Sequence, residues 1–275
     1  MEDIRISTVI PVYNEEVFLE EVVRKILRCE PDEVIVVDDG STDKSWHIIK
    51  RLAKNNPKIK AFQLKKNSGG CGFPREFGAC AATGEYVAFC DADIINIDRV
   101  DYSKILKAAR ARRADLIIGN YTGKIGRVTN SVAKPMLHLF FPEIHINRVK
   151  AGQFCSSKKL LIRFFKFTTF NRWNSTLSLI IFSYMNNYKV IEVDIGELYH
   201  TMKPDTELVQ QAEGAIRLIL AWARHYGRMN VLQNLNPIRS KERNLRPRSH
   251  LYTKIWDKDN PSFPFMKGII EEREV

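Results

Sequence analysis

The sequence has few cysteines and none of the spacings that hold a structural metal ion. There are five in 275 residues, and no two of them form a Cys-x-x-Cys pair. The odd number and the spacing argue against a disulfide framework and against a structural zinc site. Free thiols are typical of a reducing compartment, so we expect a cytoplasmic location.

Long apolar runs and a secretory signal are also absent. The longest apolar stretch, around residues 177–182, is much shorter than the roughly 20 apolar residues that cross a bilayer. The first residues, Met1-Glu2-Asp3, are acidic and lead directly into a short strand pattern. We therefore expect neither a transmembrane helix nor a leader peptide.

Acidic residues are outnumbered, with 32 Asp and Glu against 43 Lys and Arg, which gives a formal net charge of +11. Such an excess attracts nucleic acids, anionic membrane surfaces and small phosphorylated molecules alike. The sequence has no zinc-finger spacing and no aromatic-interleaved basic motif of an RNA-binding protein. Charge alone does not choose among the three, but we expect no nucleic-acid partner, and membrane contact stays a less favoured alternative.

Short β-branched runs alternate with helical patterns from residue 5 onward, as in a parallel sheet covered by helices. The chain is long enough for one elaborated α/β domain, and we predict one. The predicted strands are 6–12, 34–37, 59–64, an apolar strand from residue 86, 114–119 and 189–193. The predicted helices are 17–27, 46–52, 74–82, 101–113, 129–140, an amphipathic stretch at 174–187, and 205–226.

Two carboxylates, Asp91 and Asp93, end the apolar run that begins at Tyr86. Hard divalent cations prefer oxygen ligands and keep open positions for phosphate, so such a pair suits Mg²⁺ or Mn²⁺ beside a diphosphate. The alternative for an isolated Asp-x-Asp is a solvated turn or a helix cap. The surrounding motifs favour the metal site.

Polar residues also follow two other predicted strands. Residues 10–16 read Ile-Pro-Val-Tyr-Asn-Glu-Glu, and residues 36–43 read Val-Val-Asp-Asp-Gly-Ser-Thr-Asp. In open α/β sheets, ligands bind at the carboxyl ends of the strands. Asp39 can accept hydrogen bonds there from a base or a ribose, whereas Ser41 and Asp43 suit helix capping.

With these three motifs in this order, residues 5–100 resemble the nucleotide-sugar glycosyltransferases of GT-A fold. The resemblance implies an α/β fold with a Rossmann-like, mostly parallel central sheet flanked by helices and a helical C-terminal extension. It also implies that Asp93 binds the metal ion and that Asp91 contacts the ribose or the sugar. The residues implied around the nucleoside are Pro11, Tyr13, Glu15 and Asp39.

The Gly-rich segment 67–72 follows the third predicted strand and lacks the Gly-Lys-Ser/Thr ending of a P-loop. It also departs from the Lys-containing form of the family, but Lys65, Lys66 and Arg75 supply nearby positive charge. The further residues that we expect on the donor side are Gly69, Gly70, Arg75 and Ala92.

Residues 126–137 and 140–143 look like the acceptor segment of glucosyl-3-phosphoglycerate synthases. The resemblance implies that this segment clasps the acceptor phosphate. Gly126 permits close backbone approach, Arg127 offers a bidentate guanidinium, and Thr129 adds a hydroxyl at a helix N-terminus. We also predict a catalytic contribution from Arg127, because a cation stabilises a departing diphosphate.

The match continues through Ala151-Gly152 and residues 198–204, where the resemblance implies that His200 completes the metal site with Asp93. Gly152 and Gln153 are expected to bind the acceptor. The sequence departs from the family at Gln153, where the family has Glu, and at residues 174–177, where a second family carboxylate is lost. These departures leave open whether the acceptor is 3-phosphoglycerate or another phosphorylated molecule.

The sequence therefore predicts a metal-dependent transfer of a hexose from a nucleoside diphosphate sugar, with UDP-glucose as the expected donor. The resemblance implies catalytic roles for Asp93, Arg127 and His200, retention of configuration, and a homodimer. Residues 1–120 would bind the donor, 121–234 the acceptor, and 235–275 would form a C-terminal tail or oligomerisation arm. Two alternatives are a polyprenyl-phosphate glycosyltransferase at a membrane surface and a non-catalytic nucleotide-sugar binding protein.

Overall fold

The computed structural model describes residues 4–123, 126–170, 172–200 and 204–234. The predicted tail, 235–275, and residues 201–203 of the late loop lie outside this part. The strands are β1 Ile6–Val12, β2 Glu33–Asp38, β3 Ile59–Gln63, β4 Tyr86–Phe89, β5 Leu116–Thr122, β6 Phe154–Ser157 and β7 Val190–Glu197. The helices are α1 Leu19–Arg28, α2 Ser45–Asn55, α3 Gly72–Ala81, α4 Ser103–Arg110, α5 Lys134–Phe140, α6 Lys158–Phe165, α7 Ser175–Met185 and α8 Asp205–His225.

The strands form one seven-stranded sheet in the order β3-β2-β1-β4-β6-β5-β7. Every pairing is parallel except those of β6, which runs antiparallel to β4 and β5. The predicted mostly parallel α/β sheet is confirmed. β6 and the following helix α6 were not predicted, because the four-residue strand Phe-Cys-Ser-Ser carries too little periodic signal to be distinguished from a loop.

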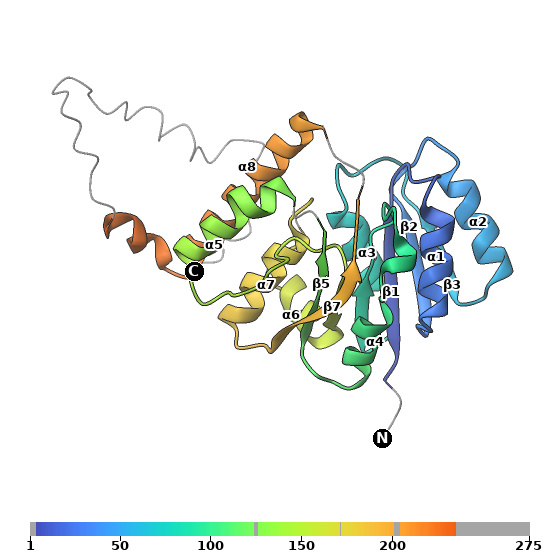
Figure 1. Cartoon of the computed structure of the whole chain (residues 1–275), viewed down its shortest axis with the longest axis horizontal. Helices are drawn as coiled ribbons and strands as arrows, with labels where there is room; N and C mark the ends of the chain where they lie inside the picture. Colours follow the sequence, from blue (N-terminus) through green and yellow to red (C-terminus); the bar gives the residue numbers. More distant parts are fainter. Residues whose placement is uncertain (1–3, 124–125, 171, 201–203, 235–275) are drawn as a thin grey trace.

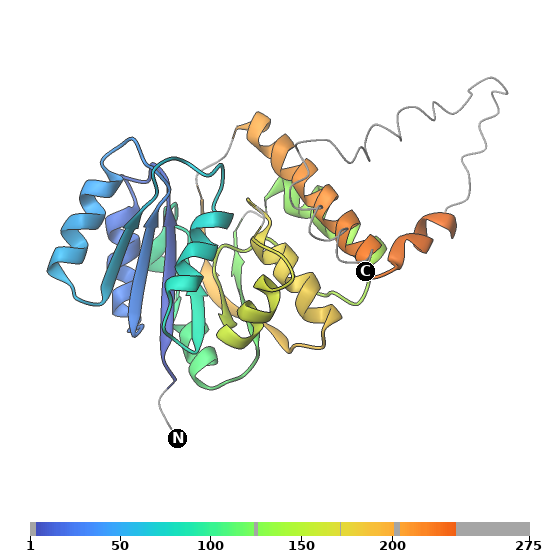
Figure 2. The same cartoon turned by 180° about the vertical axis from the view of Figure 1, so that it is seen from behind.

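Helices cover both faces of the sheet, as Figures 1 and 2 show from opposite sides. Apolar residues of α1, α2 and α4 pack on one face, and those of α3, α6 and α7 pack on the other. Helices α5 and α8 contact each other beyond the second layer. Among the described residues, no helix has the length and the apolar character that crossing a bilayer requires.

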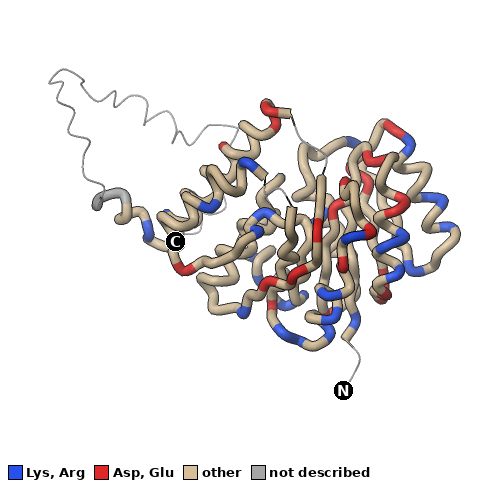
Figure 3. The backbone as a smooth tube through the Cα atoms, in the orientation of Figure 1, with Lys and Arg blue, Asp and Glu red and all other residues tan. Residues whose placement is uncertain are grey.

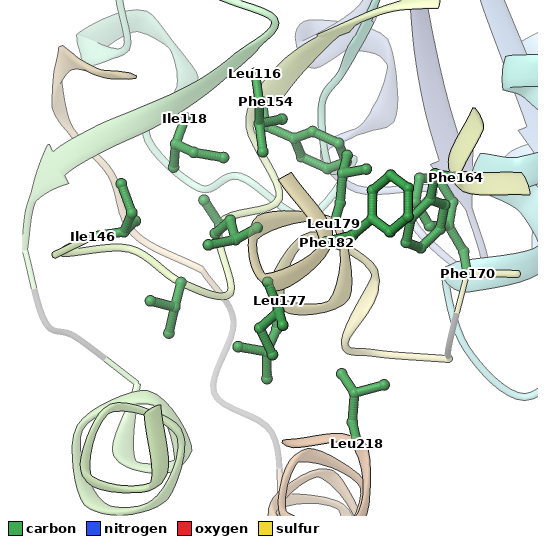
Figure 4. Packing of buried hydrophobic residues seen from close by; sticks show 14 of the residues in the cluster. Leu116, Ile118, Ile146, Phe154, Phe164, Phe170, Leu177, Leu179, Phe182 and Leu218 are labelled. Carbon is green, nitrogen blue, oxygen red and sulfur yellow. The ribbon is translucent and has the colours of Figure 1, made fainter. Parts of the chain in front are cut away.

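Helix α7 differs from its prediction as an amphipathic helix. All residues from Ser175 to Ser183 are buried, because the helix lies between the sheet and α8. In Figure 4, Leu177 and Leu179 lie between the strand residues Leu116 and Phe154 and the α8 residue Leu218. Polar positions on α7 are paired internally, and Ser178 Oγ accepts a hydrogen bond of 3.0 Å from Trp222 Nε1. The prediction of an amphipathic stretch at 174–187 is therefore wrong for residues 175–183, whose polar side chains are buried as well.

A buried acidic group ties β1 and β2 together at the edge of the sheet opposite the strand ends that carry the motifs. Glu33 is 5% exposed and accepts hydrogen bonds from Ser7 Oγ at 2.5 Å and from the Thr83 amide at 2.6 Å. Lys60 Nζ lies 2.5 Å from its second oxygen. Burial opposes ionisation, but the lysine and the hydrogen bonds outweigh it and lower the pKa of Glu33 from 4.5 to about 2.

We expect the free energy of unfolding to fall as the pH decreases from 4.5 towards 2, by about 3 kcal/mol from this group. The unfolded chain takes up the proton first, so the contribution is complete above pH 4.5 and is lost through the folded pKa. Urea titrations at a series of pH values should show that Glu33→Gln removes most of this dependence. Exposed Glu21→Gln on α1 should keep it; equal acid profiles for both variants would contradict the assignment.

Candidate functional site

A cavity of about 1140 Å³ opens at the carboxyl-terminal edge of the sheet. Its walls come from the residues that follow β1, β2, β4 and β7, from the end of β5, from the Gly-rich loop before α3, and from the first turns of α8. The predicted site residues that line it are Pro11, Tyr13, Glu15, Asp39, Gly69, Gly70, Arg75, Asp91, Ala92, Asp93, Gly126, Arg127, Thr129 and His200. The predicted residues Gly152 and Gln153 do not.

Asp91, Asp93 and His200 form one cluster, with a potential ligand atom from each within 4.8 Å of the others. His200 Nδ1 lies 3.1 Å from Asp93 Oδ1. An antiparallel bridge between Ile94 and His200 brings the two segments together, and the Ile95 amide donates to the Tyr199 carbonyl at 3.0 Å. Two carboxylates and one imidazole are a donor set that fits Mg²⁺ or Mn²⁺.

The orientation of Asp91 is fixed by two neighbours. The guanidinium of Arg75, which is 3% exposed, pairs with Asp91 Oδ1. On the other side, a Cβ added to Gly152 would lie 1.7 Å from Asp91 Oδ2. Gly152 therefore lies behind Asp91, where only a hydrogen atom fits, and its predicted contact with the acceptor stays a prediction.

Gln153 was expected to bind the acceptor, but the structure places it in the interior. Its side chain is fully buried, and neither the amide nitrogen nor the amide oxygen has a hydrogen-bond partner among the described residues. Its backbone carbonyl accepts a hydrogen bond of 2.8 Å from the Gly119 amide on β5. Gln153 thus helps to dock the start of β6, and no surface of it reaches the cavity.

Asp39 organises the Gly-rich loop. It is 2% exposed and accepts hydrogen bonds from the Ser68 amide at 3.0 Å and from Ser68 Oγ at 2.9 Å. Burial raises the pKa of Asp39, while these hydrogen bonds act in the opposite direction. Gly69 and Gly70 have backbone φ angles of 85° and 151°, which residues other than glycine rarely adopt. The loop therefore lies against the cavity in a conformation that depends on Asp39 and on glycine.

The segment expected to bind the acceptor forms the opposite wall. Arg127 Nη2 lies 2.6 Å from Asp205 Oδ1 at the first residue of α8, and both side chains are exposed. The predicted helix 129–140 starts as a π-helical turn, Thr129–Ala133, before α5 begins. An anion that binds Arg127 would have to compete with Asp205 for the guanidinium.

Several cavity residues were missed by sequence reasoning because they lie outside the motifs. Tyr121 is at the end of β5, and its ring is 6.3 Å from that of His200, with the Arg148 guanidinium 4.0 Å above it. Lys150 immediately precedes the Ala-Gly pair, and its Nζ lies 3.3 Å from Gln211 Oε1 on α8. The missed lining residues include Tyr121, Lys150, Arg172, Trp173, Glu207 and Gln211. No local pattern indicates them.

Comparison with known proteins gives a family and a set of relatives. A family model described as Glycosyl transferase family 2 matches residues 7–173. The poly(ribitol-phosphate) beta-glucosyltransferase of Bacillus spizizenii is 32% identical over 149 residues, which are 52% of this chain and 22% of that protein. Glycosyltransferase GlyG of Streptococcus pneumoniae is 33% identical over 118 residues, 42% of this chain and 38% of that protein. The chain thus matches only a minor part of the length of these relatives.

Solved structures of glucosyl-3-phosphoglycerate synthase from Mycobacterium tuberculosis share the fold. The complex with Mn²⁺, UDP and glucosyl-3-phosphoglycerate has 25% identity and a TM-score of 0.69, and covers 80% of each chain. The complex with Mn²⁺, UDP-glucose and phosphoglyceric acid has 24% identity and a TM-score of 0.70, with the same coverage. The GT-A fold expected from the sequence is confirmed.

Replacement of Gly152 by Ala should weaken the binding of Mn²⁺ by about 10-fold to 100-fold, because the added methyl group displaces Asp91. Calorimetry with Mn²⁺ alone measures this effect. Gly126→Ala is the matched control, since its nearest contact would be Thr129 Oγ1 at 3.9 Å. Wild-type Mn²⁺ affinity in a folded Gly152→Ala variant would refute the arrangement.

Proposed function

The chain belongs to glycosyl transferase family 2, and on that premise we propose that it transfers a hexose, with glucose expected, from UDP to a small phosphorylated acceptor. The observation that carries the proposal is the cluster of Asp91, Asp93 and His200 beside a large cavity at the carboxyl ends of the parallel strands. Ligands bind at this edge in open α/β sheets.

A divalent cation is part of the proposal, because the donor set fits one. The M. tuberculosis synthase has been crystallised with Mn²⁺ and with Mg²⁺ together with UDP. When bound, such an ion would neutralise the charge that develops on the diphosphate as the glycosidic bond breaks. In this chain, Asp93 and His200 would hold the ion, and Arg75 keeps Asp91 in position beside them.

Tyr13 and Asp39 are the residues that we propose to bind the nucleoside of the donor. Tyr13 is exposed at the cavity and offers a ring on which a base can stack, while Asp39 is committed to the Gly-rich loop. We propose that Asp39 acts on the nucleotide through the loop that it holds. Because Asp39 also lines the cavity, we propose a direct contact with the nucleotide as well. Uracil is proposed as the base by analogy with the structural neighbours, which bind UDP-glucose.

The acceptor is proposed by its chemical class. The structural neighbours bind phosphoglyceric acid, and relatives in sequence are named for transfer to poly(ribitol-phosphate). Both acceptors carry a phosphoryl group and a free hydroxyl. Gly126, Arg127 and Thr129 would receive the phosphoryl group, which supports a phosphorylated acid or polyol as the acceptor.

The stereochemical outcome follows from which face the acceptor attacks. The resemblance predicts retention, and this stays a prediction. Glu207 on α8 is a half-buried carboxylate of the cavity and could serve as the base that an inverting reaction requires. Proton NMR of the first-formed product distinguishes the two outcomes. The homodimer and the cytoplasmic location also stay predictions.

The decisive experiment is a product screen with UDP- and GDP-sugars and Mn²⁺ against 3-phosphoglycerate, ribitol 5-phosphate and a polyprenyl phosphate. Transfer to a water-soluble phosphorylated acceptor supports the proposal. Transfer to the polyprenyl phosphate alone would favour the membrane-surface alternative. Nucleotide binding without turnover on any acceptor would favour the non-catalytic binding protein.

Asp93→Ala should lower kcat by about 10²-fold to 10³-fold, because it removes a carboxylate that would hold the cation beside the diphosphate. Release of UDP, measured at saturating Mn²⁺ and donor, reports this effect. Asp98→Ala removes an exposed carboxylate outside the cavity and serves as the control. Undiminished, metal-dependent turnover in Asp93→Ala would exclude this role.

A further inference from the structure

Two cations of the cavity, Lys150 and Arg172, have no counter-ion in the part of the chain that the structure describes. Arg75 is paired with Asp91, and Arg127 is paired with Asp205. In contrast, among the described residues no carboxylate lies within ion-pair distance of Lys150 or Arg172. The hydrogen bond that Lys150 makes is to the neutral amide oxygen of Gln211, at 3.3 Å.

The surroundings of Lys150 make this lack of a counter-ion costly. The side chain is largely enclosed, and burial lowers its pKa from 10.5 to about 8. An ammonium group that is removed from water without an opposite charge is destabilised, and an anionic ligand relieves that cost. Gln211 itself is held by Glu207, whose Oε1 is 3.5 Å from Gln211 Nε2. The amide oxygen therefore points at the lysine and positions it.

Lys150 and Arg172 both border the Gly-rich loop. Cys71 Sγ donates to the Arg172 carbonyl oxygen at 3.3 Å. The Arg172 guanidinium carbon lies 3.4 Å from where a Cβ on Gly69 would be. Lys150 lies in the segment before β6 and Arg172 in the segment before α7, and both line the same cavity, Lys150 beside Gln211 of α8 and Arg172 beside Gly69 of the loop.

We propose that Lys150 and Arg172 form a phosphoryl-binding subsite between the Gly-rich loop and α8, with Gln211 as the residue that positions Lys150. This inference rests on the proposed function and adds a site outside its motifs. A phosphate monoester or a diphosphate fits, because each carries up to two negative charges that match two cations, whereas a neutral sugar hydroxyl would leave both cations uncompensated. The group can belong to the donor diphosphate or to the acceptor.

The test compares Lys150→Met and Lys150→Arg with Lys107→Met, an exposed control on α4. Calorimetry with Mn²⁺ measures the Kd of UDP and of uridine, and initial rates give the KM of the acceptor found in the screen. Lys150→Met should weaken the phosphoryl ligand by about 10-fold to 100-fold, with substantial recovery in Lys150→Arg. Uridine should bind equally to all variants.

The two measurements, the Kd of UDP and the KM of the acceptor, show which ligand carries the phosphoryl group that binds here. A raised Kd for UDP with an unchanged acceptor KM assigns the subsite to the donor, and the reverse assigns it to the acceptor. Unchanged values for both ligands in Lys150→Met would overturn the inference while wild-type turnover upholds the proposed function. Equal losses for UDP and uridine would indicate a structural role and would also overturn it. A wild-type protein that neither binds UDP nor transfers sugar would instead remove the premise.

A pH series adds a readout that a structural role would not change. Among the described residues, the titratable group that acts on Lys150 is the Cys71 thiol, around which Arg75, Asp91 and Asp93 also lie, and Glu207 lies behind Gln211. Affinity for the phosphoryl ligand should decrease above about pH 8 in the wild type, because the ammonium loses its proton. Lys150→Arg keeps its charge and should bind equally well up to pH 9. The same decrease in both proteins would exclude Lys150 as its source.

Discussion

The site depends on one long-range contact, the pairing of the segment after β4 with the segment after β7. Ile94 and His200 form an antiparallel bridge, and this places an imidazole 3.1 Å from Asp93 across 107 residues of sequence. Without this contact, Asp91 and Asp93 would be an acidic pair of the kind often found in a solvated turn or at a helix cap. With it, three oxygen and nitrogen ligands converge on one volume at the edge of the cavity.

Two residues next to the cluster, Arg75 and Gly152, fix the position of Asp91. The buried Arg75 neutralises Asp91, and the missing side chain at Gly152 leaves that carboxylate the space it occupies. The attraction between opposite charges is stronger in surroundings that exclude water, and the Arg75 side chain is buried. Positive charge that is left without a partner gathers instead around Lys150 and Arg172. Elsewhere, Lys and Arg are interspersed with Asp and Glu along the described chain (Figure 3).

The two sides of the cavity have different origins in the fold. The side on which we propose that the donor binds consists of the ends of β1, β2 and β4, which adjacent parallel strands bring to one edge. The side on which we propose that the acceptor binds consists of the segment before α5 and the first turns of α8. These parts are fixed by helix packing and not by sheet register. The relatives in sequence and the structural neighbours carry different acceptors in their names.

The sequence by itself determined the mostly parallel sheet and the location of Asp39, Asp91 and Asp93, because hydrophobic periodicity is local and parallel strands end at a common edge. It did not determine the antiparallel strand β6, whose four residues carry little pattern, or the full burial of α7. Only the tertiary structure decided that Gly152 supports Asp91, that Gln153 is interior, and that Lys150 and Gln211 face the cavity. The positions of these residues depend on contacts between segments far apart in the chain, and no local pattern of residues records such contacts.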